Sequence, residues 1–408
     1  MKSIINIAYK FRIYPTKEQV VFFAKHFGCV RFIYNHLLGT RRESYLNEKK
    51  KISGFECKRM ISTLKKEKEY TWLKEVNSQS LQEAALNLEK SYSRFFKKIN
   101  NAQYPRFKKK NSKQSFCVPQ HFHINVQEEY ILIPKLKTPI KTTFHRDLGN
   151  IKKLNSLTFS KTPSDEYYVC INVEEEIVHK KLIIRVEKES KAVGVDLGLK
   201  DFIVTSHGEK IKAPKYLRKS EKALKKSQKK VSKAVKGSKN REKKRKILAK
   251  KHERVKNQRK DFIHKISNKL VSKNQAIFLE TLDVKNMIKN RHLSKSIADV
   301  GWGEFIRQLK YKSKLFGTII IQIGKWEPTS KLCSTPSCSY KNNSLSLADR
   351  YWECPICKTI HDRDINAAKN IEIIGREAPE LKPVEKKANV FSIKKIQAFS
   401  VKQESLAS

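Results

Sequence analysis

The chain has few acidic residues for its length of 408: 40 Asp and Glu stand against 88 Lys and Arg, which gives a formal net charge of +48. A charge of this size exceeds what solubility requires, and its self-repulsion destabilises a compact fold unless an anion relieves it. One lysine run can simply be a solvated face, but here the excess extends over the whole chain. The shortage of acids therefore indicates a polyanionic partner.

Long hydrophobic runs are also missing. No segment reaches the roughly 18 consecutive apolar residues of a membrane span, and residues 1–10 lack the apolar core and cleavage site of a secretory signal. A disulfide framework is missing as well, because four of the cysteines are scattered without a pattern: Cys29, Cys57, Cys117 and Cys170. Such thiols fit the interior of a protein in a reducing compartment. We therefore expect a cytoplasmic protein.

The other four cysteines have the spacing of a zinc ribbon: Cys333, Cys338, Cys354 and Cys357. Four thiolates fill the coordination sphere of Zn²⁺ and leave no position for an activated water, so we expect a structural zinc. A ribbon this small depends on its metal to fold. The first pair is separated by four residues instead of the usual two, which predicts one irregular knuckle.

The first half of the chain predicts a small β domain with a helical insert. Apolar residues alternate over 5–13, as in a strand. Thr16 and Gln19 then have the spacing of a capping box before a long helix, and a second amphipathic helix covers 81–99. Short strands follow at 130–133, 157–159 and 167–173. We assign residues 1–16 and 105–182 to the β domain and 17–104 to the insert, provided that the first strand pairs with the later ones.

The second half has the element order of a ribonuclease H fold, so the chain is expected to be an α/β multidomain protein. Three strands (192–196, 202–205 and 210–212) are followed by two long basic helices within 218–260, and then by strand, helix, strand and helix at 276–279, 305–315, 318–322 and 365–374. This predicts a nuclease domain over 183–375, with the zinc ribbon 333–357 inserted, and a flexible tail over 376–408.

Three acids occupy the ends of these predicted elements: Asp196 and Glu280 end apolar strands, and Asp364 starts the last helix. Separately, each has an ordinary explanation, namely a turn cap, a surface carboxylate and a helix N-cap, for which Asp362 and Asn366 would compete. Together they suit two Mg²⁺ ions, which take oxygen ligands and promote phosphodiester hydrolysis. We expect Asp196 to bridge the ions and Glu280 and Asp364 to complete one shell each, with Asp362 as the substitute for Asp364.

Candidate nucleic-acid contacts are less specific. Rings and cations interleave at Tyr104, Arg106, Phe107 and Lys108, as on surfaces that bind single strands. Arg31 on the first helix could reach a phosphate. Basic side chains of the second long helix would follow a nucleic-acid backbone without reading its sequence: Lys243, Lys244, Arg245, Lys250 and Lys251.

Several motifs resemble those of the TnpB family, transposon-encoded RNA-guided DNA nucleases that are related to type V CRISPR effectors. The resemblance spans about residues 4–375 and is carried by Phe11–Gln19, Arg31–Asn35, Gly194–Gly198, Gln258–Phe262, Glu280 with Leu282, and His361–Ala368.

The resemblance implies a wedge β domain, a helical recognition insert and a RuvC-like nuclease domain that contains a zinc finger. It matches Asp196, Glu280 and Asp364 to the family's catalytic triad, with two Mg²⁺ ions, and the four cysteines to its zinc ligands. It also implies a guide RNA from the end of the element, a target DNA, a monomer with its RNA, and a nucleoid-associated prokaryotic protein.

Two other functions remain open. One is a transposase in the strict sense, which joins DNA as well as cutting it, although no Tyr or Ser stands out as a strand-transfer nucleophile. The other is a non-catalytic RNA-guided repressor, as some relatives that have lost triad acids are, whereas this chain keeps all three.

Overall fold

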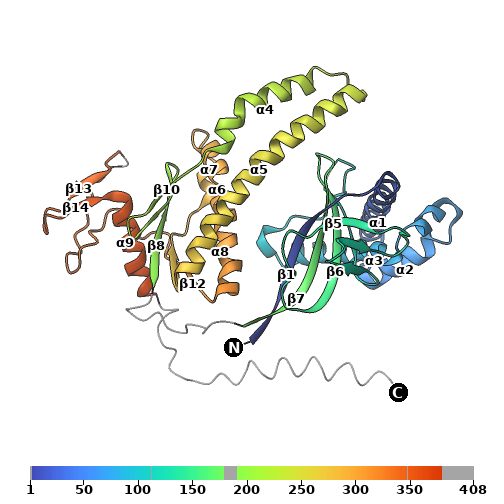
Figure 1. Ribbon diagram of the computed structural model, residues 1–408, viewed down its shortest axis with the longest axis horizontal. Coiled ribbons are helices and arrows are strands. Elements are labelled where there is room, and N and C mark those ends of the chain that lie inside the picture. The colour runs from blue at the N-terminus through green and yellow to red at the C-terminus, as the bar shows by residue number, and fades with distance from the viewer. Residues whose placement is uncertain (1, 112, 179–190, 347, 379–408) are drawn as a thin grey trace. The chain divides into compact units, whose positions relative to one another are not determined.

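The computed structural model describes residues 2–111, 113–178, 191–346 and 348–378 (Figure 1). They form two compact units, one of residues 1–178 with 220–256 and one of 179–219 with 257–408, each taken within the described ranges. Most of the predicted tail 376–408, and residues 179–182 of the predicted β domain, lie outside those ranges. Among the described helices, none is long and apolar enough to cross a membrane.

The first unit contains a seven-stranded sheet in the order β2-β6-β7-β1-β5-β4-β3. The opening strand pairs antiparallel with β7 from Lys2↔Val178 to Ile13↔Tyr167, which confirms that it joins the later strands. The helices of residues 17–101 are therefore inserted between β1 and β2. The strands are β1 (Lys2–Ile13), β2 (Gln114–Val118), β3 (His123–Asn125), β4 (Tyr130–Leu132), β5 (Ile140–Thr143), β6 (Ile151–Lys161) and β7 (Tyr167–Val178).

The insert consists of α1 (Lys17–Glu48), α2 (Gly54–Leu64), η1 (Lys68–Glu75), α3 (Ser78–Phe96) and η2 (Ile99–Asn101). The predicted capping box is present, since the Thr16 hydroxyl accepts from the Gln19 backbone N–H at 3.3 Å and the Gln19 side chain accepts from the Thr16 backbone N–H at 3.1 Å. The helix predicted through Ile99 was too long. Lys98 and Asn100 adopt left-handed backbone angles that end α3, and Ile99 is exposed.

The second unit contains a five-stranded sheet in the order β10-β9-β8-β11-β12. The pairs of β8 with β9 and of β9 with β10 are antiparallel, whereas β8 with β11 and β11 with β12 are parallel. This confirms the element order that the sequence predicts. The strands are β8 (Ala192–Leu197), β9 (Asp201–Thr205), β10 (Lys210–Lys212), β11 (Ala276–Leu279) and β12 (Ile319–Gln322).

The two faces of this sheet contact different helices, and the alternation of side chains along the strands decides which residue faces which. Val193 and Val195 belong to a core with Ile263 of α5 (Lys239–Lys273) and Phe305 of α8 (Trp302–Phe316). Ala192 and Phe278 belong to a second core with Ile371 of α9 (Arg363–Arg376). Even-numbered positions of β8 and β11 therefore face α9. Two short helices, α6 (Val284–Met287) and α7 (Ser294–Val300), precede α8.

The two predicted basic helices are present as α4 (Tyr216–Ser232) and α5, and Figure 1 shows them as an antiparallel hairpin. Residues 220–256 of this hairpin pack with the first unit, whereas the predicted nuclease domain 183–375 includes the whole hairpin. The reason is local: Lys246 forms an ion pair with Asp165 at 2.5 Å, and Glu253 accepts a hydrogen bond from Ser164.

Candidate active site and metal centres

Asp196 and Glu280 lie on the same face of the five-stranded sheet. Asp196 shares its parity along β8 with Ala192 and Gly194, which face α9, and Glu280 shares its parity with Phe278 in the same way. The parallel register pairs Leu279 with Val195, so Asp196 follows Val195 in β8 and Glu280 comes directly after the end of β11. Both acids consequently project from adjacent strands toward the side that α9 covers.

Two glycines allow α9 to lie directly on this face. A Cβ at Gly194 would lie 2.0 Å from the Ala368 carbonyl oxygen, and a Cβ at Gly375 would lie 2.2 Å from the Phe278 ring. Polar contacts hold the same arrangement, since Ser206 accepts from the Gly194 N–H at 3.1 Å and donates to Glu372 of α9 at 2.5 Å. The backbones of β8 and α9 therefore lie in direct contact, and the Ser206 hydrogen bonds hold them together.

This docking brings Asp364 to the same edge as the other two acids. Asp364 lies one turn, about 6 Å, before Ala368 along α9, and Asp196 lies two residues, about 7 Å, beyond Gly194 along β8. The convergence is visible in the electrostatics, because burial and the charges of Glu280 and Asp364 raise the pKa of Asp196 from its ordinary 3.8 to about 8. Burial also raises the pKa of Glu280, although the hydrogen bond from Thr329 lowers it in part.

The structure distinguishes Asp364 from its predicted substitute. Asp362 is the N-cap of α9 and accepts from the backbone N–H groups of Asp364 and Ile365, each at 3.1 Å. It also pairs with Lys210 at 2.5 Å. Burial alone would raise its pKa, but the Lys210 ammonium and these backbone donors hold the pKa of Asp362 below its usual range. Asp362 is thus engaged in holding the helix, whereas Asp364 lies in its first turn and its charge contributes to the raised pKa of Asp196.

Two arginines that sequence reasoning missed accompany Asp364. Arg350 approaches its carboxylate at 3.3 Å and Arg363 at 3.2 Å. Arg350 belongs to no sequence motif. It lies between Cys338 and Cys354 in the sequence, and the fold places it beside Asp364. The three carboxylates, of which Asp196 has a pKa raised first by burial and then by the charges of Glu280 and Asp364, are a donor set of the kind that suits divalent cations.

The four predicted zinc ligands form one cluster. The sulfur atoms of Cys333, Cys338, Cys354 and Cys357 all lie within 4.8 Å of one another, which fits a single tetrahedral Zn²⁺. The hydroxyl and backbone N–H of Thr359 lower the pKa of Cys357 to about 5, and thus favour the thiolate that a metal binds. A hairpin of β13 (Tyr351–Glu353) and β14 (Ile360–Asp362) supports the cluster. His361, which the sequence marks only as the first residue of the His361–Ala368 motif and not as a neighbour of the thiols, contacts the Cys333 sulfur at 3.0 Å.

The candidate nucleic-acid residues of the first unit occupy different environments. Arg31 donates to Gln114 at 3.0 Å, and the ammonium of Lys108 lies 3.8 Å from the centre of the Tyr34 ring, where burial lowers its pKa. Tyr104, Arg106 and Phe107 are exposed. Asn35 fixes their segment through two hydrogen bonds with the backbone of Lys108, at 2.7 and 2.9 Å.

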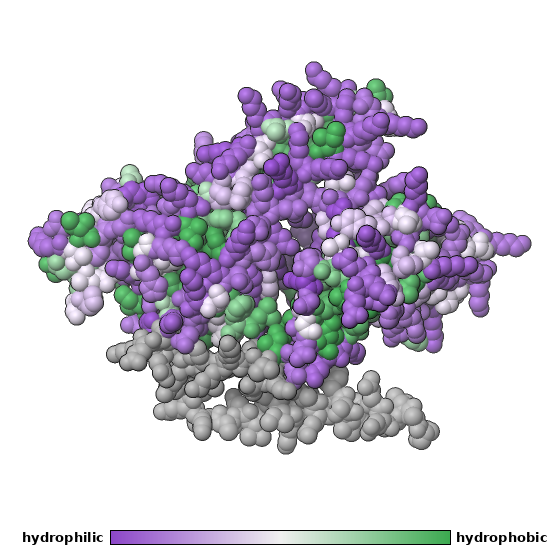
Figure 2. Space-filling view, in the orientation of Figure 1, coloured by the Kyte–Doolittle hydropathy of each residue, from purple (hydrophilic) through white to green (hydrophobic). Residues whose placement is uncertain are grey.

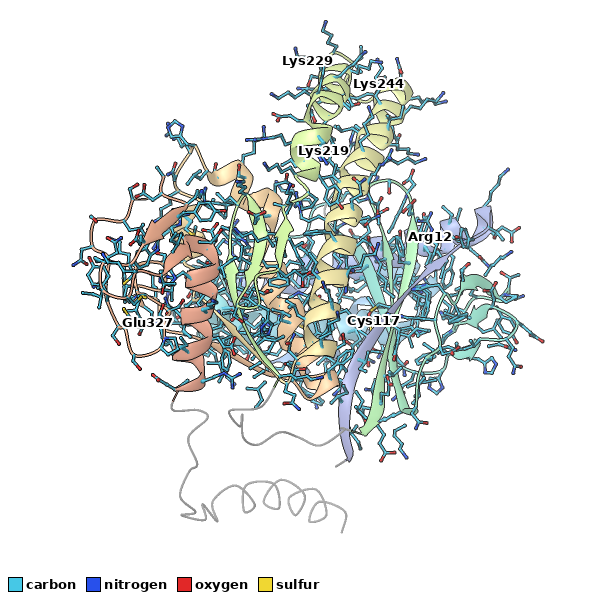
Figure 3. The ribbon with its side chains drawn as sticks, turned by 60° about the vertical axis from the view of Figure 1, so that its left-hand side comes forward. Arg12, Cys117, Lys219, Lys229, Lys244 and Glu327 are labelled. Carbon is cyan, nitrogen blue, oxygen red and sulfur yellow. The ribbon has the colours of Figure 1, made fainter. Side chains whose placement is uncertain are left out.

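The basic residues of α5 are mostly available to solvent. Lys243, Arg245 and Lys250 are exposed and Lys244 is half-buried, whereas Lys251 donates to Ser227 of α4 at 2.7 Å and so joins the two helices. Figure 2 shows hydrophilic side chains over most of α4 and α5, and Figure 3 shows Lys229 and Lys244 projecting from them. The hairpin therefore presents a cationic surface.

Three family models match separate parts of the chain. Residues 168–291 match a family described as "Probable transposase", residues 1–50 match a "Helix-turn-helix domain", and residues 302–371 match a "Cas12f1-like, TNB domain". The second description does not fit the geometry, because residues 2–48 form the strand β1 followed by the one helix α1.

The five-stranded mixed sheet with its flanking helices, the four-cysteine cluster and the basic surface define an α/β protein with a candidate zinc site and a candidate nucleic-acid surface. Its sequence is 33% identical over 378 residues to a "Putative RNA-guided DNA endonuclease" of Streptomyces pristinaespiralis, covering 93% of this chain and 91% of the relative. It is 29% identical over 384 residues to "Putative RNA-guided DNA endonuclease InsQ" of Escherichia coli K12, with 90% and 92% covered. The chain belongs to the TnpB family.

Among solved structures, the chain is similar to Cas12f1 in a complex with guide RNA and target DNA, at 16% identity and a TM-score of 0.49, with 93% of this chain and 100% of that chain covered. It is also similar to the RNA-guided endonuclease Cas-phi3, at 10% identity and a TM-score of 0.47, with 93% and 94% covered.

Proposed function

We propose that this chain is an RNA-guided DNA endonuclease of a transposable element, and that it hydrolyses phosphodiester bonds with two Mg²⁺ ions held by Asp196, Glu280 and Asp364. The observation that carries the proposal is the placement of these three carboxylates in β8, directly after β11 and in the first turn of α9, where burial, and then the charges of Glu280 and Asp364, raise the pKa of Asp196 to about 8. Family membership and the names of the relatives supply the RNA guide and the DNA substrate.

Each acid has a separate part in this proposal. Asp196, whose pKa responds to the charges of both other acids, would bridge both ions, and Glu280 and Asp364 would each complete one shell. The ions would supply an activated water and stabilise charge on the leaving oxygen. Thr329 holds the Glu280 carboxylate, and Arg350 and Arg363 reduce the repulsion around Asp364. Cys333, Cys338, Cys354 and Cys357 would hold a structural zinc.

The proposed domain layout follows the same reasoning. Residues 1–16 and 105–182 would be the wedge domain, 17–104 the recognition insert, and 183–375 the ribonuclease H-like (RuvC) domain with the ribbon 333–357, of which residues 220–256 pack with the first unit. The basic hairpin would follow the phosphate backbone with Lys243, Lys244, Arg245 and Lys250, and the exposed Tyr104, Arg106 and Phe107 would contact unpaired nucleotides, with Arg31 and Lys108 beside them. The protein would act as a monomer with its RNA, in the prokaryotic cytoplasm at the nucleoid.

The test is DNA cleavage by the chain co-expressed with the sequence that flanks the 3′ end of its gene. We expect RNA from that flank to co-purify, and Mg²⁺ to permit cleavage of a matching DNA. Asp196→Ala should retain the RNA and bind the target but leave it uncut. An uncut target with the wild-type complex would instead favour the non-catalytic binder, and joined DNA products would favour the strict transposase.

A further inference from the structure

One segment of the second unit connects the carboxylates with the thiols. Residues 329–334 begin at Thr329, whose hydroxyl donates to the Glu280 carboxylate at 2.8 Å, and include Cys333 of the thiol cluster. Thr329 is 4% exposed, so the donor side of this hydrogen bond is shielded from water. The segment thus touches both candidate metal centres within five residues.

Two asparagines of α9 hold this segment by its backbone. The Asn370 amide donates to the carbonyls of Thr329 at 2.8 Å and Leu332 at 2.6 Å. The Asn366 amide donates to Leu332 at 2.7 Å and accepts from the Ser334 N–H at 3.0 Å. Both side chains are almost completely buried, at 1% and 2% exposed. Such bonds are costly to break, because the partners left behind cannot turn to water.

The same helix carries Asp364 in its first turn, so three features share one rigid support. α9 fixes Asp364 directly, Glu280 through Thr329, and Cys333 through the segment that Asn366 and Asn370 hold. The Cys333 sulfur in turn contacts His361, at 3.0 Å, two residues before α9 begins. A displacement of the thiols would therefore move the backbone that carries the Thr329 hydroxyl.

We propose that Thr329 is a positioning residue that fixes Glu280 for divalent-cation binding, and that Asn366 and Asn370 couple this position to the thiol cluster. Outer groups that orient a metal-binding carboxylate typically affect metal affinity about 10- to 100-fold. The inference rests on the proposed function only in taking the carboxylates as a cation site; guide RNA and DNA are not required for it.

The test measures Mn²⁺ binding to the full chain without nucleic acid, by electron paramagnetic resonance of the free ion. Thr329→Val should weaken Mn²⁺ binding about tenfold or more, whereas Thr329→Ser, which keeps the hydroxyl, should retain it. Thr318→Val is the matched control, because the buried Thr318 hydroxyl donates to the Val271 and Asn274 carbonyls and contacts no carboxylate. Mn²⁺ binding by Thr329→Val equal to that of the control would overturn the role of Thr329.

The coupling is tested by removing zinc. In the wild type, loss of zinc to a thiol-selective chelator should weaken Mn²⁺ binding. In Thr329→Val the same loss of zinc should weaken Mn²⁺ binding little further, because the hydrogen bond from Thr329 to Glu280 is already absent. Asn370→Ala should release zinc faster and bind Mn²⁺ more weakly. Full additivity of zinc removal and Thr329→Val would refute the coupling. An uncut DNA target would refute the proposed endonuclease but would leave these binding results unaffected.

Discussion

Asp196 is the residue whose chemistry depends most on its neighbours. An Asp in an unfolded chain releases its proton near pH 4, but in this fold the proton is held to about pH 8 by burial and by Glu280 and Asp364. Between these values the folded state binds more protons than the unfolded state. The free energy of unfolding of the metal-free site must then fall as pH rises from about 4 to about 8.

We therefore expect Asp196→Asn to flatten this pH dependence, with a difference in unfolding free energy of up to about 5 kcal/mol across the interval. Denaturant unfolding in magnesium-free buffer at several pH values measures it. Mg²⁺ held as proposed would bind the carboxylate form and should stabilise the wild type most near pH 8. The control is Asp261→Asn, whose exposed carboxylate pairs with Lys265 at 2.8 Å and should leave the slope in place; an unchanged slope in Asp196→Asn would contradict the assignment.

At the scale of elements, the candidate acid site depends on the position of α9 on β8 and β11, and this position requires two glycines, Gly194 and Gly375, which have no side chain. Gly194→Ala would place a methyl group 2.0 Å from the Ala368 carbonyl and 2.7 Å from the Glu372 nitrogen, both backbone atoms that cannot turn away. We expect it to destabilise the fold by about 3 kcal/mol or more and to displace Asp364 from the other acids. Thermal unfolding and Mn²⁺ affinity should both report this.

Gly303→Ala in α8 is the comparison. A Cβ there meets nothing within 4 Å, and alanine favours a helix by up to about 1 kcal/mol over glycine. This change should raise the midpoint of thermal unfolding slightly and leave cation binding unchanged. If Gly194→Ala behaved like Gly303→Ala, α9 could not lie against β8 as described.

The elements also show what the sequence could and could not predict. Apolar alternation and helical spacing located the strands and long helices of both units, since each pattern reflects one local period. The same patterns placed Asp196 and Glu280 at strand ends. They favoured Asp364 over Asp362 only from the helix that starts there, because the sequence does not show that the Asp362 carboxylate caps α9 and pairs with Lys210. They also missed Thr329 and Arg350, whose partners lie far away in sequence and are fixed by tertiary packing alone.

At the scale of the whole molecule, the net charge of +48 predicts how affinity for nucleic acid depends on salt. Each phosphate contact contributes about −0.9 to the slope of log affinity against log salt on duplex DNA. Substituting Lys243, Lys244, Arg245 and Lys250 together by Gln should therefore reduce the steepness by up to about 3–4, with equal loss on unrelated sequences, because backbone contacts do not read bases. Fluorescence anisotropy over a range of salt concentrations measures the slope.

A matched variant separates surface charge from charge used inside the fold. Lys251 lies next to Lys250 but donates to Ser227 and the Ala223 carbonyl of α4, so Lys251→Gln should loosen the hairpin in thermal unfolding while changing the salt slope by less than about 1. A quadruple variant with an unchanged slope would mean that the phosphates lie elsewhere on the molecule. The positive charge of α5 would then keep copies of the chain apart and would not bind nucleic acid. The exposed aromatic residues near Tyr104 would become the next candidates for nucleic-acid contact.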